Sequence, residues 1–177
     1  MKNAKNLAKR GKIRHLRSYT EMIKVLFVCH GNICRSVSAE YILKNLVRKR
    51  GRETEFFIDS AATSTEEIGN PIYPPMRQAL KQMDIPVGDH RARQLKRQDY
   101  DAFDFIIGMD RENLFYMKQI LGSDPDHKMH YLLEFSDRSG GIIDDPWYTR
   151  QFERCAKQIL AGCKGLLEKI IPGDRHC

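Results

Sequence analysis

The sequence has few of the features that mark membrane, secreted or zinc-binding proteins. No stretch approaches the roughly 18 uninterrupted apolar residues that a membrane-spanning helix requires. The start of the chain also lacks the apolar run of a secretory signal, so we expect a cytoplasmic location. The five cysteines are odd in number and have no framework spacing, which favours a reducing compartment. Cys29 and Cys34 have no His or Cys pair at a finger-like distance, so zinc is not expected.

Acidic residues are absent from residues 1–20, which carry seven lysines and arginines. The rest of the chain has 23 basic and 23 acidic residues, so the net charge of +7 belongs to this leader. A basic run of this kind can contact nucleic acid or anionic lipid. The alternatives are a solvated tail or an upstream start before a natural beginning at Met22. Its apolar residues are too sparse for a strong amphipathic face, which favours these alternatives.

We therefore divide the chain into a basic, flexible leader (1–21) and one domain (22–177). We expect the folded domain to bind no nucleic acid. The chain has 177 residues, with 41% apolar and 30% charged residues, as expected for a globular domain with a sizeable core.

Short apolar runs alternate with helical periodicities along this domain. Strands are predicted at 24–29, 56–60, 103–109 and 129–135. Helices are predicted over 39–47 (closed by Gly51), 74–83, 111–121 and 152–170. This alternation predicts an α/β fold with a four-stranded, parallel, twisted sheet that has helices on both faces.

The turn after the first strand has the composition of a phosphate-binding loop. Cys29 and Arg35 are separated by five residues, enough for backbone N–H groups and a helix N-terminus to face one centre. The same positive potential stabilises a thiolate, so Cys29 is the candidate nucleophile. Arg35 can bind two phosphate oxygens through its planar fork, and Ser36 can donate to the sulfur. Cys29 could instead be a structural cysteine, but the order strand, glycine turn, Arg-Ser and helix favours the phosphate site.

The segment 28–36, Val-Cys-His-Gly-Asn-Ile-Cys-Arg-Ser, resembles the signature of the low-molecular-weight protein tyrosine phosphatases. Downstream, 144–148 (Asp-Asp-Pro-Trp-Tyr) is similar to that family's general-acid loop. The motifs 59–61, 90–93 and 109–110 fall between them in family order. The resemblance covers roughly residues 23–171.

The resemblance implies a phosphocysteine intermediate on Cys29 and no metal or other cofactor. It also implies that Asp145 protonates the leaving group and then activates water. Asp144 competes for this role, and Asp145 is preferred because it directly precedes the proline. The implied phosphate-binding residues are His30, Gly31, Asn32, Ile33, Cys34 and Arg35.

The resemblance further implies residues that support the loop and border the substrate. Asn32 is expected in a left-handed conformation held by Ser60. Other expected supporting residues are Ser36, His90, Asp110 and, with less support, Glu40. The residues expected to border the substrate pocket are Trp147, Tyr148 and Glu67. Cys34 matches a cysteine that can form a reversible disulfide with the nucleophile.

The sequence also departs from the family pattern. Val37 replaces a proline, and His30 replaces an aliphatic residue. The loop 66–75 lacks an aromatic residue over the substrate and has Tyr73 and Pro75 where Asp and Arg are common. Since this loop helps to set specificity, the substrate is the most open part of the interpretation.

We expect a phosphotyrosine-bearing protein as substrate and partner. An arginine phosphatase is the first alternative. The resemblance suggests that such enzymes have a threonine at the position of Ile33, so the isoleucine favours phosphotyrosine. Arsenate reductases need further cysteines near residues 85–110, where this chain has none. A non-catalytic phosphopeptide-binding module is expected to have lost Cys29 or Asp145, and both are present.

Overall fold

The computed structural model describes residues 22–137 and 141–172. Four strands form one sheet in the order β2-β1-β3-β4, and each neighbouring pair is parallel. The strands are β1 (Ile23–Cys29), β2 (Phe56–Ala62), β3 (Phe105–Gly108) and β4 (Met129–Tyr131).

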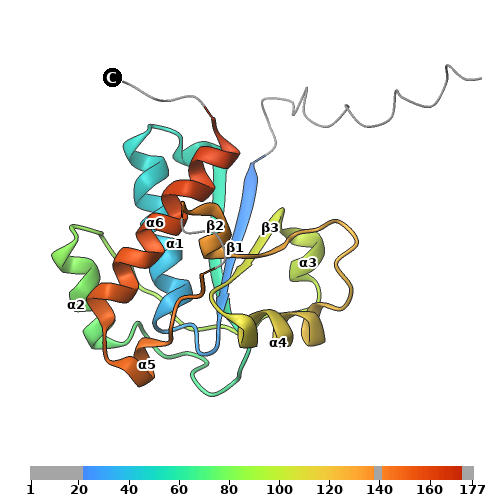
Figure 1. The fold of residues 1–177 in the computed structure, drawn as a ribbon, viewed down its shortest axis with the longest axis horizontal. Helices are drawn as coiled ribbons and strands as arrows, with labels where there is room; N and C mark the ends of the chain where they lie inside the picture. The colour runs from blue at the N-terminus through green and yellow to red at the C-terminus, as the bar shows by residue number, and fades with distance from the viewer. Residues whose placement is uncertain (1–21, 138–140, 173–177) are drawn as a thin grey trace, which may run out of the picture.

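Helices cover both faces of the sheet, as Figure 1 shows. One face carries α1 (Arg35–Lys49), α2 (Pro74–Gln82), α5 (Pro146–Thr149) and α6 (Phe152–Ile170). The other carries α3 (Asp99–Ala102) and α4 (Arg111–Leu121). The predicted four-stranded parallel sheet with helices on both faces is confirmed.

The central strand β1 supplies both hydrophobic cores. Val25 and Phe27 belong to the larger core beneath α1 and α6. Leu26 and Val28 point the other way, into the smaller core beneath α4. All four side chains are fully buried, which is why this strand reads as a continuous apolar run. Burial on both faces fixes the strand, and its carboxyl end delivers Cys29 to the edge of the sheet.

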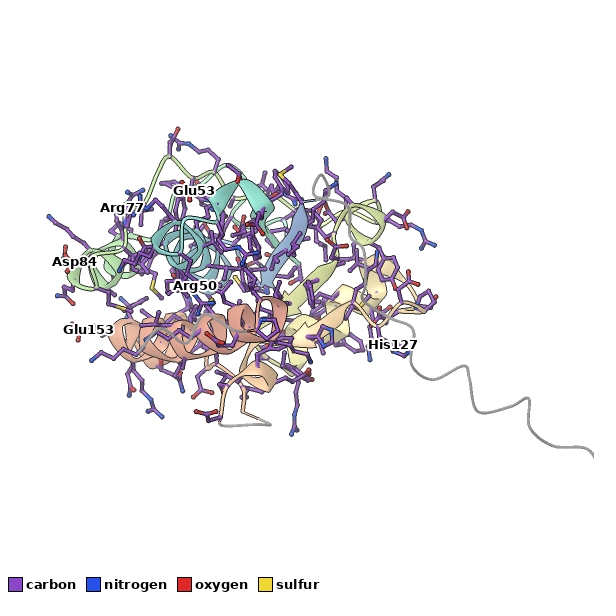
Figure 2. All side chains as sticks on the ribbon, turned by 90° about the horizontal axis from the view of Figure 1, so that it is seen from above. Arg50, Glu53, Arg77, Asp84, His127 and Glu153 are labelled. Carbon is purple, nitrogen blue, oxygen red and sulfur yellow. The ribbon has the colours of Figure 1, made fainter. Side chains whose placement is uncertain are left out.

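Helices α1 and α6 pack against each other on the larger core. Figure 2 shows them side by side, with Arg50 between them. Arg50 Nη2 donates to Glu168 Oε1 of α6 at 2.5 Å. The chain leaves α1 through Gly51, whose φ of 65° suits glycine, as the sequence predicted for this helix end.

The fourth strand is shorter than predicted. Residues 129–135 were expected to form one strand, but β4 ends at Tyr131 and a 3-10 helix, η2 (Leu132–Phe135), follows. Leu132 and Leu133 are both buried, which a strand with one solvent-facing side would not allow for consecutive residues. Glu134 Oε1 accepts the N–H of Tyr131 at 3.1 Å and closes the turn. The prediction of a strand over 132–135 was therefore wrong.

Other boundaries differ by smaller amounts. The third strand covers 105–108 within the predicted 103–109, and the first helix begins at Arg35, four residues before its apolar stripe. The short elements α3, α5 and η1 (Glu53–Glu55) were not predicted, because three or four residues are too few to show a periodicity.

Within 22–137 and 141–172, no helix has the length and apolar character needed to cross a membrane. The leader, 1–21, lies outside the described residues, so its division from the domain remains a prediction.

Candidate active site

The phosphate-loop candidate lies between the end of β1 and the start of α1, at the carboxyl edge of the sheet. Cys29 is only 2% exposed. Its Sγ accepts the backbone N–H groups of Asn32 and Ser36, each at 3.4 Å. Ser36 Oγ lies 3.0 Å from the same sulfur. Three polar hydrogens can thus converge on Cys29 Sγ.

Asn32 holds the loop in its curled form. Its φ of 59° is in the left-handed region, which asparagine tolerates better than most residues. The side chain is fully buried, and its Nδ2 donates to Ser36 Oγ at 2.9 Å and to Ser60 Oγ at 2.8 Å. Its Oδ1 accepts the N–H of Arg93 at 3.1 Å. His90 Nε2 donates to the Asn32 carbonyl at 2.7 Å, since a carbonyl only accepts.

A buried carboxylate sets the direction of this network. Glu40 is 5% exposed and pairs with Lys44. Ser60 Oγ donates to Glu40 Oε2 at 2.5 Å, because an ionised carboxylate only accepts. Ser60 must then accept from Asn32, and so must Ser36. The hydroxyl hydrogen of Ser36 is therefore free to point at Cys29 Sγ.

Arg35 is the largest of the fully buried side chains, 2% exposed, and it is surrounded by acceptors. Its Nη1 donates to Asp110 Oδ2 and to the carbonyl of Ile143, the latter at 3.0 Å. Its Nη2 donates to Asp145 Oδ2 at 3.0 Å. Burial alone would lower the pKa of Arg35, but the charges of Cys29, Asp145 and Asp110 outweigh it and raise the pKa.

The bonds of Arg35 to described residues use three of its five N–H donors. The Nε–H and one Nη2–H remain as donors for phosphate oxygens.

Asp145 caps the short helix α5. Its Oδ1 accepts the N–H of Trp147 at 3.0 Å while Oδ2 faces Arg35, so both oxygens are fixed. Asp145 borders the pocket above Cys29. The neighbouring Asp144 is exposed and does not border this pocket. The structure therefore brings Asp145, rather than Asp144, to Arg35.

The pocket above the loop is small, about 130 Å³. Cys29 and Arg35 border it from the loop, and Trp147 and Tyr148 border it from α5. The other residues around it are His30, Gly31, Ile33, Cys34, Glu66, Glu67 and Asp145. A narrow pocket with aromatic side chains on its walls and an anion-binding group at its base can hold an aryl phosphate.

The structure brings together the predicted site residues that are far apart in sequence. Ser60 and His90 contact Asn32, and Asp110 contacts Arg35. Glu67 lies at the pocket rim and accepts from Asn70 Nδ2 at 2.7 Å.

Some residues of the site were missed. Glu66 borders the pocket, and its Oε2 lies 3.1 Å from His30 Nε2. The only sequence signal for Glu66 was its position in the loop 66–75. The contacts of Ile143 and Arg93 involve backbone groups, which leave no signal in a sequence.

The cysteines within the described residues are buried thiols. Cys29, Cys34, Cys155 and Cys163 are all free. Burial, with the nearby charge of Cys29, raises the pKa of Cys34 strongly, so this thiol stays protonated. Among the described residues, no three His, Cys, Asp or Glu side chains form a group that could hold a metal ion.

A parallel α/β sheet with an anion-binding loop after its first strand defines a class of phosphate-handling proteins. Comparison with known families narrows this class. The model of the low molecular weight phosphotyrosine protein phosphatase family matches residues 24–173. The chain belongs to this family and is a hydrolase, which confirms the expectation from its motifs.

Three relatives show how close the similarity is. YfkJ of Bacillus subtilis, a low molecular weight protein-tyrosine-phosphatase, is 39% identical over 84% of this chain and 96% of its own. Its crystal structure covers 86% of this chain and 97% of its own, with a TM-score of 0.82. The low molecular weight phosphotyrosine protein phosphatase of Gallus gallus is 40% identical over 84% of this chain and 96% of its own. The Drosophila arginine phosphatase DARP is 34% identical, covers 86% of this chain and 100% of its own, and has a TM-score of 0.76.

Proposed function

We propose that this protein hydrolyses phosphotyrosine in protein substrates through a phosphocysteine intermediate. The observation that carries the proposal is the convergence of Cys29, Arg35 and Asp145 at one small pocket. These are a nucleophile, an anion-binding group and a proton donor, the parts that in-line phosphoryl transfer requires.

In the first step, the Cys29 thiolate attacks phosphorus on the side opposite the leaving oxygen. The S–P bond forms, the P–O bond to the phenol breaks, and Asp145 gives its proton to the departing oxygen. Arg35 and the loop N–H groups bind the equatorial oxygens throughout. The hydroxyl of Ser36 stabilises the sulfur when it carries charge.

In the second step, the Asp145 carboxylate takes a proton from a water molecule, whose oxygen attacks the phosphocysteine. The S–P bond breaks, inorganic phosphate leaves, and the thiolate of Cys29 is restored. Asp145 regains its proton in this step, so one group serves as acid and then as base. Every group in both steps is a residue of this chain or water, so the proposal involves no metal or other cofactor.

Redox protection is a further part of the proposal. Oxidation of Cys29 to a sulfenic acid by a peroxide would allow Cys34 to form a disulfide with it and release water. The raised pKa of Cys34 keeps it a thiol rather than a second nucleophile during turnover. A reversible thiol switch suits the reducing cytoplasm, where we place the protein.

Phosphotyrosine is favoured over phosphoarginine by the walls of the pocket. Ile33 is 8% exposed and borders the pocket with its branched side chain. The rings of Trp147 and Tyr148 can stack on a phenyl group. Similarity to the Drosophila arginine phosphatase keeps phosphoarginine as the second candidate.

A substrate comparison with variants of Ile33 tests this assignment. The protein should hydrolyse a phosphotyrosine peptide far faster than the matched phosphoarginine peptide, in the presence of a chelator. Ile33→Thr should move this ratio toward phosphoarginine. Ile33→Val is the matched control, because valine has the shape of threonine without the hydroxyl. A wild-type preference for phosphoarginine, or chelator-sensitive activity, would overturn the proposal.

A further inference from the structure

Tyr73 lies between the two loops that the proposed reaction uses. It directly precedes α2, and α5 lies below α2 in the view of Figure 1. Its backbone N–H donates to the carbonyl of Ile33, in the phosphate loop, at 2.9 Å. Its ring packs on Trp147, which follows the general-acid candidate by two residues, with 5.2 Å between ring centroids. One residue thus contacts both the phosphate loop and the Asp145 loop.

Arg150 completes this contact from the other end of α5. Its Nη2 donates to the hydroxyl of Tyr73 at 3.3 Å. Its guanidinium lies over the rings of Tyr73 and Phe152, 5.8 and 5.4 Å from their centroids. The ring of Phe152 is 5.6 Å from that of Tyr73. Three rings and one guanidinium therefore form a single stack beside the pocket.

The backbone of Arg150 is strained. Its φ of 58° and ψ of 16° lie in the left-handed region, which is unfavourable for a residue with a Cβ. An exposed arginine is unfavourable at this position unless contacts of its side chain offset the backbone strain. The contacts of the guanidinium with the rings of Tyr73 and Phe152 can offset this strain.

The other end of the acid loop is held separately. The N–H of Ile143 donates to the carbonyl of Met109 at 2.9 Å, and its own carbonyl accepts from Arg35. Asp145 therefore lies between a backbone anchor at Ile143 and the stack at Tyr73 and Arg150. Loss of the stack would remove the side-chain contacts that join α5 to Tyr73, while Asp145 would keep its bond to Arg35.

We propose that Tyr73 and Arg150 are positioning residues that hold Trp147 and Asp145 over the phosphate loop. The inference rests on the proposed function of Asp145 as general acid. Tyr73 occupies the loop in which this sequence departs from its family, so the proposal gives that departure a physical role. Neither residue borders the pocket, and both act through Trp147 and its helix.

Tryptophan fluorescence gives a direct readout, because Trp147 is the only tryptophan of the chain. Tyr73→Leu removes the ring, and Tyr73→Phe keeps it without the hydroxyl. We expect Tyr73→Leu to lower the steady-state anisotropy of Trp147 and increase its quenching by acrylamide. Tyr73→Phe should retain most of the wild-type signal. Tyr116→Leu, on the far helix α4, is the matched control and should change neither.

The leaving group separates positioning from general damage. The ratio kcat/KM reports the first step, in which the leaving group departs, whereas kcat also includes hydrolysis of the phosphocysteine, which is common to both substrates. With phenyl phosphate, which needs the acid, kcat/KM of Tyr73→Leu should fall about 10- to 100-fold. With dinitrophenyl phosphate, which does not, kcat/KM should fall less than about threefold. Equal losses on both substrates, or an unchanged Trp147 signal, would overturn the proposal. If the wild-type protein hydrolyses neither substrate, the proposed function itself fails.

Arg150→Gly gives a second test, which separates the effect on thermal stability from the effect on activity. Glycine adopts the left-handed conformation without cost, so Tm should stay constant or rise. The activity on phenyl phosphate should nevertheless fall, with Trp147 more mobile, because the guanidinium is lost. A variant that is as active as wild type on phenyl phosphate would show that Arg150 does not position the acid. A fall in Tm with equal activity losses on both substrates would show a merely structural role.

Discussion

At the scale of single residues, the site is built around groups whose hydrogen bonds can point only one way. Glu40 accepts, so Ser60 donates to it and accepts from Asn32. Because Ser36 accepts from Asn32, its hydroxyl hydrogen is free to point at Cys29 Sγ. A buried polar group without a partner costs about 1 to 3 kcal/mol, so removing one member of the network should destabilise the loop.

Asp145→Asn tests the proton donor with little change of shape. Asparagine has one acceptor oxygen where Asp145 has two, so it can accept from the N–H of Trp147 or from Arg35 but not from both through separate oxygens. It also cannot deliver a proton as a carboxylic acid does. We expect kcat/KM with phenyl phosphate, which reports departure of the leaving group, to fall about 10²- to 10⁴-fold and kcat/KM with dinitrophenyl phosphate to fall far less. Steady-state kinetics on both substrates measure this difference.

The control for this experiment is Asp144→Asn, which changes the exposed neighbour and should retain wild-type rates on both substrates. A selective loss in Asp144→Asn, with Asp145→Asn unaffected, would transfer the role to Asp144. Equal losses on the two substrates in Asp145→Asn would remove Asp145 from proton transfer.

At the scale of elements, α6 contains two glycines that its own stability does not favour. Each glycine costs about 1 kcal/mol in a helix relative to alanine. At Gly162, a Cβ would lie 2.5 Å from Leu132 Cγ. At Gly165, a Cβ would lie 1.7 Å from the carbonyl oxygen of Phe135. The two glycines lower the helix propensity of α6, but they allow η2 to pack directly on it.

Gly165→Ala should therefore destabilise the fold, although alanine is the better helix former. The clash is with backbone, which cannot rotate away, so η2 and α6 must separate. We expect a loss of about 2 to 4 kcal/mol in the free energy of unfolding, in the range of overpacked cores. Urea denaturation followed by circular dichroism measures it.

Lys164→Ala is the matched control, since it changes an exposed neighbour on the same helix and should stay within about 0.5 kcal/mol of wild type. An alanine at 165 that stabilises the protein would show that η2 moves away from α6 without cost.

At the scale of the whole molecule, the larger core contains thiols that must stay protonated. Burial raises the pKa of Cys155 to about 12, and burial also raises the pKa of the fully buried Cys163 thiol. The ordinary value for a thiol is about 9. Above that pH the unfolded chain loses these protons and the folded chain keeps them, so folding stability falls as pH rises.

The expected slope is up to about 1.4 kcal/mol per pH unit for each buried thiol. Cys163→Ala should make the loss of stability between pH 9 and 11 shallower by this amount, although the variant is less stable at pH 7. Urea unfolding at several pH values with a reducing agent measures both effects. Parallel curves for the variant and the wild type would contradict the assignment.

The sequence by itself determined the order of the four strands and the longer helices, and the position of the candidate nucleophile. The apolar run of β1 and the stripes of α1 and α6 are local periodicities, and each is readable because burial selects apolar residues at a fixed spacing. The phosphate loop is also local, since Cys29 and Arg35 belong to one turn between a strand and a helix.

Only the tertiary structure decided which distant groups meet at that turn. Asp145 was identified by resemblance, but its bond to Arg35 spans 110 positions of the chain. The end of β4 at Tyr131 and the glycines of α6 depend on what packs against them. The stack at Tyr73 joins segments that no local pattern connects. Such contacts follow from the packing of whole elements, and a one-dimensional pattern does not contain them.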